Sequence, residues 1–425
     1  MTSRYFKNPY EDYDETKHGT AECDILKRDT VIQLVQSYVD KILLETKKAN
    51  YKLRDDLYVG EAGIAFMFWK LSRFDEFKHS YPCLEHASYY IQRAKEISRS
   101  KNKSTNDASR IAFLCGHSGI SAVSAVISKD IGDSTKFSHD IEKFLTGHTV
   151  CKSNDYDADE ILVGRAGYLS GAYWLNQVLS EKPIKNDIIE DVCDKLIKRG
   201  REYSRSKRCP LPLMYEYHDS DYLGAAHGLC SILHMLLESP WFVRTTNGVF
   251  NNISKTKLQD VQTAVEYFLG IQDDDGNFPT RLFNLNKKLI HWCHGCPGAV
   301  YLLAKAYLIF KEDKYLLACR KSCQAIWCQG LLRKGPGICH GIAGNGYAFL
   351  LMYRLTQERK FFYMAAKFME FLTTDQFLNG ARTPDRPFSL YEGLAGTVCF
   401  LIDLLQPASA YFPFMDVFDI KFHQP

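Results

Sequence analysis

The sequence has almost no excess of charge of either sign, since 53 lysines and arginines stand against 50 aspartates and glutamates, leaving +3. So small an imbalance creates no strong field that would attract nucleic acid or an anionic membrane. Long hydrophobic runs are absent as well, because no window approaches the 18 uncharged apolar residues expected of a membrane-spanning helix. We therefore expect no nucleic-acid partner and no membrane span.

Targeting signals are also lacking. The first ten residues contain no apolar stretch of signal-peptide length, position 2 is Thr2 rather than the glycine that myristoylation requires, and the last residues fit no prenylation or retention signal. We therefore expect a cytoplasmic protein. In a reducing cytosol, most of the 14 cysteines would be small buried hydrophobic residues, and a few would be available to bind metal.

The length and composition indicate a folded globular protein. The chain has 425 residues, of which 46% are hydrophobic and 24% are charged, close to the average for soluble domains. This length suffices for one large domain or for two to three ordinary ones. Because no low-complexity tract or linker divides the sequence, we predict a single domain over residues 1–425.

A short phrase recurs along the whole chain. Each copy has a glycine, two further residues, a second glycine or another small residue, and then an apolar stretch. The seven copies are Val59–Gly63, Cys115–Gly119, Val163–Gly167, His227–Ser231, His294–Gly298, His340–Gly344 and Glu392–Gly396. Their first glycines are 46 to 67 residues apart. Recurrence at a loosely constant spacing is typical of repeat architectures.

The segments around these phrases predict two layers of helices. Residues 64–71, 298–307 and 346–353 are apolar on most faces, whereas residues 30–44 and 360–372 are amphipathic. This alternation predicts an inner layer that is buried on both sides and an outer layer with one face in water. Seven such pairs would close into an α/α toroid or form an open superhelical solenoid, and the spacing alone leaves both possibilities open.

The glycine pairs have a structural explanation as tight turns at the start of each inner helix, so chemistry must come from the residues that vary. Cys293 and Cys339 each lie two residues before a first glycine, and His340 lies directly before one. At one rim of a toroid these side chains would converge. Two thiolates and an imidazole with a vacant fourth position are typical of catalytic zinc, while buried cysteines without metal are the alternative.

Other polar residues near the phrases are weaker candidates. His227 occupies the same position as His340 and would be a general acid or base, or a hydrogen-bonded structural histidine. Glu160 is an acid–base candidate, although a solvated carboxylate is the simpler interpretation. Cys296 completes a C-x₂-C spacing that also suits metal. His291 and His294 flank a proposed ligand and are candidates for orienting it.

These phrases resemble the signature motifs of the LanC-like proteins, the eukaryotic relatives of bacterial lanthionine synthetase cyclases. The resemblance rests on Trp292–Gly298, Gly337–Gly341 and Ala225–Gly228 and extends over essentially the full length. Further phrases that resemble the family are Arg4–Tyr10, Pro212–Tyr217, Gly330–Gly335 and Arg382–Gly393, and Val398–Pro407 is similar to the third vertebrate paralogue group.

The resemblance implies a double seven-helix α/α toroid with a zinc ion held by Cys293, Cys339 and His340. By the same match His227 would be the active-site histidine. Glu160 stands where the cyclases use an aspartate, so the carboxylate is kept on a longer arm.

The resemblance also implies a ligand. Relatives bind glutathione near the zinc, and the matching anchors here are Arg4, Lys334 and Arg382. Cys296 departs from the family pattern, because relatives often have alanine there, and it would either compete for metal or simply pack.

The activity implied is zinc-dependent addition of the glutathione thiol to electrophiles such as dehydroalanine or dehydrobutyrine residues. His227 would protonate the resulting enolate carbon. Two alternatives stay open: a non-catalytic glutathione-binding scaffold with protein signalling partners, and a zinc whose role is purely structural. The sequence does not name the physiological electrophile.

Overall fold

The structure, a computed structural model, describes residues 3–101, 108, 111–244, 248–251 and 253–418. Over these residues the chain is built almost wholly from helices, with one two-stranded sheet. The internal contacts define two compact units. The first takes its residues from 1–101, 290–292 and 323–425, and the second from 102–289 and 293–322. A single domain over residues 1–425 stays a prediction.

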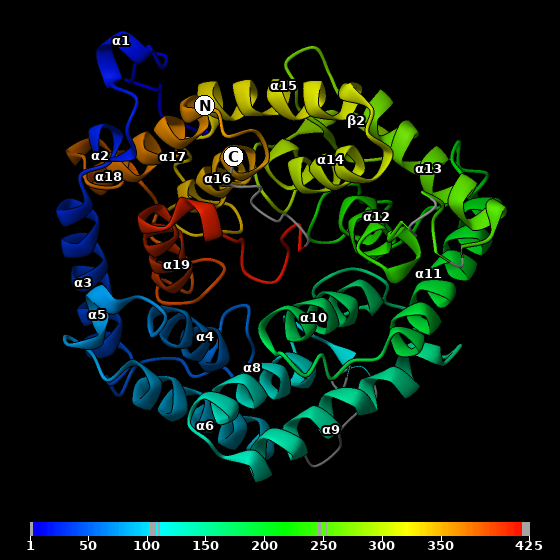
Figure 1. The fold of residues 1–425 in the computed structure, drawn as a ribbon, viewed down its shortest axis with the longest axis horizontal. Coiled ribbons are helices and arrows are strands. Elements are labelled where there is room, and N and C mark those ends of the chain that lie inside the picture. The colour runs from blue at the N-terminus through cyan, green and yellow to red at the C-terminus, as the bar shows by residue number, and fades with distance from the viewer. Residues whose placement is uncertain (1–2, 102–107, 109–110, 245–247, 252, 419–425) are drawn as a thin grey trace. The chain divides into compact units, whose positions relative to one another are not determined.

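The first unit has an almost fully buried inner layer. Its inner helices are α4 (Glu61–Leu71), α16 (Ile342–Thr356) and α19 (Leu394–Leu405), and every residue of α4 and α19 is buried. The outer helices α6 (Cys83–Lys101), α17 (Arg359–Phe371) and α3 (Arg28–Glu45) pack on α4, α16 and α19 respectively (Figure 1). Short helices complete it: α1 (Glu15–His18), α2 (Glu22–Ile25), α5 (Asp75–Lys78), α18 (Asp375–Gly380) and the 3₁₀ turn η2 (Pro407–Ser409).

The outer helix α3 shows how the sequence pattern produces this packing. Val31, Val35, Val39 and Ile42 recur every three or four residues and are buried, while the opposite face is in water. The partner of α3 is α19, from the other end of the chain, and α19 also packs against α4. The C-terminal helices therefore complete the packing around the N-terminal ones.

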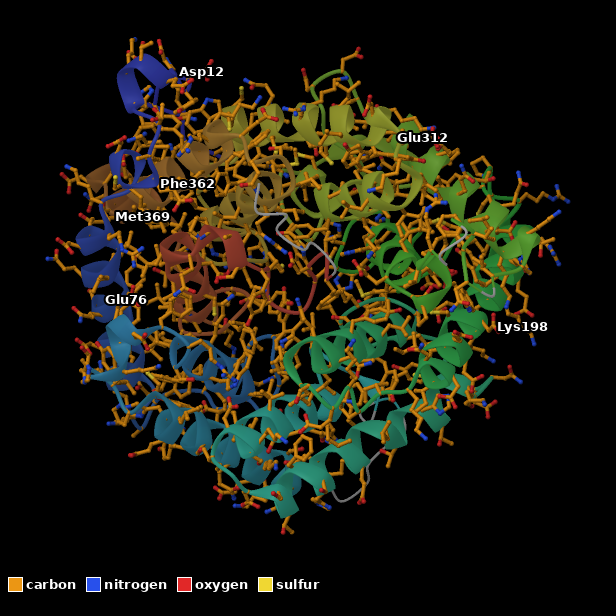
Figure 2. The ribbon with its side chains drawn as sticks, viewed as in Figure 1. Asp12, Glu76, Lys198, Glu312, Phe362 and Met369 are labelled. Atoms are coloured by element: carbon orange, nitrogen blue, oxygen red, sulfur yellow. The ribbon has the colours of Figure 1, made fainter. Side chains whose placement is uncertain are left out.

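The second unit repeats this arrangement. Its inner helices are α8 (His117–Asp130), α10 (Arg165–Val178), α12 (Leu229–Leu237) and α14 (Cys296–Phe310). Its outer helices α9 (Ser134–Lys152), α11 (Asn186–Lys207) and α13 (Lys255–Gly270) pack on α8, α10 and α12. Exposed side chains such as Lys198 point away from the buried face of α11 (Figure 2).

Three further elements belong to this part of the chain. A 3₁₀ turn, η1, covers Pro240–Phe242, and α15 (Asp313–Gln329) begins in the second unit and ends in the first. The strands β1 (Pro279–Arg281) and β2 (Asn284–Lys288) form an antiparallel hairpin with an irregular register. Arg281 of β1 also bridges Tyr222, so the hairpin is attached to the segment that precedes α12.

The recurring glycines begin the inner helices. The first glycine of every phrase is an N-cap residue, at Gly60, Gly116, Gly164, Gly228, Gly295, Gly341 and Gly393. The second glycine lies against backbone: a Cβ at position 344 would be 1.8 Å from the carbonyl oxygen of Ile338. The loop thus folds back onto the first turn of the helix it precedes, which confirms the predicted role of the phrase.

The inner and outer helices predicted around residues 64–71, 298–307, 346–353, 30–44 and 360–372 are all present, as α4, α14, α16, α3 and α17. Within the described ranges, no helix has both the length and the apolar character to cross a membrane.

Candidate functional site

The three predicted metal ligands lie close together. Cys293, Cys339 and His340 each offer one ligand atom, and these atoms all lie within 4.8 Å of one another. Both cysteines are buried and His340 is half-buried. Two sulfurs and one imidazole nitrogen form the donor set of a zinc site that leaves one position open. The residues present therefore fit this ion.

Three chain segments of the first unit fix Cys339. Its backbone N–H donates to the carbonyl oxygen of Tyr391 at 2.8 Å, and Tyr391 in turn donates to the carbonyl oxygen of Tyr58 at 3.0 Å. The Tyr58 hydroxyl donates to the sulfur of Cys339 at 2.9 Å, and its ring stacks on Tyr391 with centroids 4.8 Å apart. The Tyr58 hydroxyl therefore helps to fix the position of the Cys339 sulfur.

Cys293 follows a segment that is anchored in the same unit. Trp292 is fully buried and stacks on Phe412 with centroids 5.1 Å apart. The side-chain amide of Asn345 donates to the carbonyl oxygens of Ile290 at 3.1 Å and Gly330 at 2.8 Å. Asn345 belongs to α16, the helix that begins two residues after His340, so one helix orders both regions of the sequence.

His291 is a buried neutral imidazole beside this site. Its ring centroid is 6.0 Å from that of His340. Burial, followed by the nearby positive charges of His340, Lys334 and Arg4, lowers the pKa of His291 to about 3. A neutral ring adds no positive charge that would compete with a cation.

The three predicted glutathione anchors lie on adjacent backbone segments of the first unit. Arg333 donates its N–H to the carbonyl oxygen of Arg4 at 3.0 Å, and Arg382 donates to the carbonyl oxygen of Arg333 at 2.7 Å. Arg4, Lys334 and Arg382 are all exposed, and the Arg382 guanidinium pairs with Asp385 at 2.7 Å. The charges of Arg4 and Lys334 both help to lower the pKa of His291, so these two side chains lie near the proposed metal ligands.

His227 and Glu160 form a pair in the second unit. Nδ1 of His227 lies 3.1 Å from Oε2 of Glu160. Glu160 is only 2% exposed, and it accepts backbone N–H groups from Leu162 at 3.0 Å and Val163 at 2.6 Å. The interpretation of Glu160 as a solvated carboxylate is therefore wrong. A carboxylate held by two N–H donors is an acceptor, so Nδ1 of His227 donates to it and Nε2 is left for proton transfer.

Aromatic rings hold the His227 imidazole in place. Tyr217 lies parallel to it, at an interplanar angle of 3° with centroids 4.7 Å apart. The centroids of Tyr222 and His294 lie 5.7 Å and 6.1 Å from it. The His227 side chain keeps 25% of its surface exposed. One edge and one face of the ring are thus fixed while part of it stays open to a reactant.

Sequence reasoning missed Tyr58 and assigned no role to Tyr217. The repeat itself contains a signal for Tyr58, because Tyr58, Cys293, Cys339 and Tyr391 each lie two residues before the first glycine of their phrases. Cys296 is fully buried as the first residue of α14, where its N–H donates to Asn277 at 2.9 Å. It does not belong to the group of converging ligand atoms.

Three comparisons bear on this site. Residues 51–417 match a family described as "Lanthionine synthetase C-like protein". "Glutathione S-transferase LANCL1" of Danio rerio is 34% identical over 426 residues, which cover 97% of this chain and 99% of that protein. Among solved structures, "Nisin cyclase" matches with a TM-score of 0.62 at 16% identity, covering 89% of this chain and 94% of that one. The last likeness concerns the fold alone, and it confirms the predicted α/α toroid class.

Proposed function

Since the chain belongs to the lanthionine synthetase C-like family, we propose that it is a zinc-dependent enzyme that adds the glutathione thiol to electrophiles such as dehydroalanine or dehydrobutyrine residues. The observation that carries this proposal is the convergence of the Cys293, Cys339 and His340 ligand atoms within 4.8 Å. The name of the Danio rerio relative, a glutathione S-transferase, supports glutathione as the thiol donor.

Cys293, Cys339 and His340 would hold the metal and Arg4, Lys334 and Arg382 the glutathione. Zinc bound by two thiolates and an imidazole would supply a Lewis acid that lowers the pKa of an incoming thiol. Arginine and lysine side chains pair well with carboxylates, of which glutathione has two. The location of the three cations on adjacent segments supports their acting on one ligand.

The addition balances without a leaving group. A bond forms between the thiol sulfur and Cβ of the dehydroamino acid, the Cα–Cβ π bond breaks, and its electron pair moves into an enolate. His227, with a proton on each ring nitrogen, delivers the Nε2 proton to Cα, and Glu160 accepts from Nδ1, so that the neutral ring left behind keeps its proton on Nδ1. The thiol proton leaves to water, from which His227 is protonated again.

A glutathione-binding scaffold with a structural zinc is the second candidate. It would use the same ligands and anchors, but it would not need an imidazole positioned by a buried carboxylate. The hydrogen bonds that fix Glu160 and His227 favour catalysis.

The His227→Ala variant separates these candidates. We expect zinc content and glutathione affinity to be retained, while the rate of addition to a dehydroalanine peptide falls by about 10²- to 10⁴-fold, the usual contribution of a general acid. Mass spectrometry of the adduct and calorimetry with glutathione measure the two properties. Unchanged addition in the variant would remove His227 from the mechanism.

X-ray absorption at the zinc edge tests the metal site directly. We expect one additional sulfur scatterer when glutathione is added to the purified protein. If the purified protein carries no stoichiometric zinc, the proposed function is wrong. If zinc is present but gains no sulfur ligand when glutathione is added, the zinc is a structural ion.

A further inference from the structure

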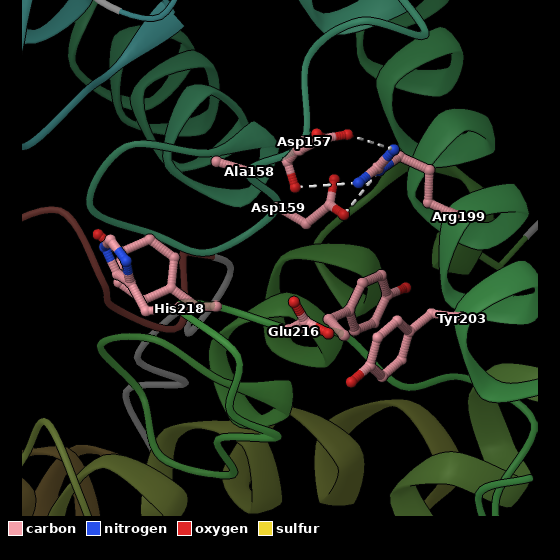
Figure 3. Close-up of a pocket in the computed structure, with 9 residues that line it drawn as sticks. Asp157, Ala158, Asp159, Arg199, Tyr203, Glu216 and His218 are labelled. Carbon is pink, nitrogen blue, oxygen red and sulfur yellow. Dashed lines mark hydrogen bonds and ion pairs between the residues drawn. The ribbon is translucent and has the colours of Figure 1, made fainter. Parts of the chain in front are cut away.

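A cavity of about 420 Å³ opens in the second unit beside the His227–Glu160 pair. Asp157, Asp159 and Arg199 lie along one side of it, and Tyr203 and Glu216 lie on the other (Figure 3). Tyr217 also lines the cavity and stacks on His227 at 4.7 Å. We call this cavity the Tyr217 pocket. Its volume lies in the range of pockets that hold small ligands or single side chains.

Arg199, the cation among these residues, is already engaged. Its Nε donates to Asp159 at 2.8 Å and its Nη2 donates to the backbone carbonyl of Asp157 at 2.9 Å. Asp159 is buried and also accepts from Arg165 at 2.6 Å. Because the Arg199 guanidinium already donates to Asp159 and to the Asp157 carbonyl, the Tyr217 pocket is poorly suited to an anion.

Two carboxylates of the pocket have spare hydrogen-bonding capacity. The Asp157 carboxylate lies 3.5 Å from Arg199, and its side chain is 88% exposed. The Glu216 carboxylate lies 3.9 Å from Lys207, and its side chain is 34% exposed. Both ion pairs are long and partly exposed, so these carboxylates can accept hydrogen bonds from an incoming cation.

Tyrosine rings form the remaining wall. The Tyr203 hydroxyl donates to Asp221 at 2.7 Å and the Tyr215 hydroxyl donates to the carbonyl oxygen of Leu196 at 3.0 Å. Both hydroxyls are satisfied within the protein. Tyr215 is buried, whereas Tyr203 is partly exposed, so the ring of Tyr203 offers aromatic surface to a ligand. Burial, followed by the neighbouring carboxylates of Asp221 and Glu216, raises the pKa of Tyr203. Aromatic rings and carboxylates together suit a long side chain that ends in a cation.

A strained turn fixes Tyr217 between the pocket and His227. Tyr217 and Ser220 exchange backbone hydrogen bonds of 3.1 Å and 3.2 Å, and the two residues between them, His218 and Asp219, have φ of 47° and 54°. Left-handed conformations of residues other than glycine are unfavourable, and they persist where the surroundings impose them. The position of Tyr217 is therefore set by the backbone.

We propose that the Tyr217 pocket binds a lysine or arginine side chain next to the dehydrated residue of a peptide electrophile. The inference rests on the proposed function, since it places the alkene carbon at His227. An extended peptide advances about 3.3 Å per residue, and the Tyr217 and His227 rings are 4.7 Å apart. The basic residue therefore lies one or two positions from the dehydroamino acid.

Peptides that differ at one position test this specificity. A dehydroalanine peptide carries lysine, norleucine or glutamate at each of the two positions on either side, and kcat/KM for glutathione addition is measured. We expect lysine at one of these positions to exceed norleucine about tenfold, with glutamate lowest. In the Asp157→Asn/Glu216→Gln double variant, the ratio of lysine to norleucine should fall close to 1.

The Glu202→Gln variant is the matched control, because Glu202 is an exposed acid of the same unit that does not line the pocket, and it should keep the preference. The proposed role of the Tyr217 pocket is wrong if addition shows no preference for lysine. It is also wrong if the double variant keeps that preference. The binding of unreactive peptides with alanine in place of dehydroalanine separates the two proposals. If no peptide is turned over but the lysine peptide binds about tenfold more tightly than the norleucine peptide, the proposed function fails while the pocket stands.

Discussion

At the scale of single residues, the Tyr58 hydroxyl acts directly on a proposed metal ligand. It donates to the sulfur of Cys339 at 2.9 Å. Outer hydrogen bonds of this kind typically contribute 10- to 100-fold to metal affinity. We therefore expect Tyr58→Phe to bind zinc about 10- to 100-fold more weakly in competition with a chelator. Tyr81→Phe, which removes a hydroxyl bonded to Asp40 in the same unit, should keep the parent affinity. Equal affinities in both variants would contradict the role of Tyr58.

Glu61 links the stability of the protein to pH. Burial raises its pKa to about 7, although Arg93 and Tyr51 act to lower it. The folded state therefore binds this proton more tightly than the unfolded chain, whose carboxyl has a pKa near 4.5. The stabilisation is complete below pH 4.5 and is lost as the pH rises towards 7. We expect a loss on the order of 3 kcal/mol in unfolding free energy, from 1.36 kcal/mol per pKa unit.

Denaturant unfolding at several pH values measures this loss. The Glu61→Gln variant cannot titrate, so its unfolding free energy should vary less between pH 4.5 and 7 than that of the parent. If parent and variant show the same pH dependence, another group is responsible.

At the scale of the secondary-structure elements, a glycine at the end of a phrase allows a loop to approach its helix closely, as at Gly63, Gly167, Gly344 and Gly396. A Cβ at position 344 would lie 1.8 Å from the Ile338 carbonyl oxygen, so Gly344→Ala must displace the loop that carries Cys339. We expect this change to lower the free energy of unfolding by about 2–4 kcal/mol and to weaken zinc binding. Gly270→Ala in α13 meets no atom within 4 Å and should be neutral or slightly stabilising. Thermal unfolding and chelator competition measure both effects, and equal stability of the two variants would refute this account.

The inner helices and the convergence of Cys293, Cys339 and His340 could be predicted from the sequence because both follow from the repeated phrase. Every inner helix begins at the first glycine of a phrase, so its signal recurs seven times, and the shared frame places Cys293 and Cys339 at equivalent positions. The pairing of Glu160 with His227 could not be predicted in this way. It joins residues 67 positions apart, and it depends on the backbone N–H groups of Leu162 and Val163, which carry no side-chain signal.

The position of Tyr217 was hidden for a similar reason. It depends on positive φ at His218 and Asp219. Because neither residue is a glycine, the sequence does not indicate a tight turn there. The pocket beside it is likewise formed by residues of two loops and of α11, whose spacing follows no common period.

At the scale of the whole molecule, a buried ion pair joins the two ends of the chain within the first unit. Nζ of Lys70 in α4 lies 2.6 Å from Asp403 in α19, both side chains are 2% exposed, and Tyr347 donates to the same carboxylate at 2.8 Å. Removing one partner leaves a buried charge without compensation, so Lys70→Met should lower the free energy of unfolding by about 3–5 kcal/mol. Adding Asp403→Leu should recover much of that loss. A double-mutant cycle measured by urea unfolding gives the coupling, and strictly additive effects would contradict it.

The packing of α19 on α3 has a consequence for how the protein is made. The apolar face of α3 ends at Ile42, and the helix that covers it begins at Leu394, about 350 residues later. At about 5–20 residues per second, the ribosome needs roughly 20–70 s to supply that partner. During this interval the valines of α3 stay exposed on the nascent chain, so we expect chaperones that bind nascent chains to recognise this segment.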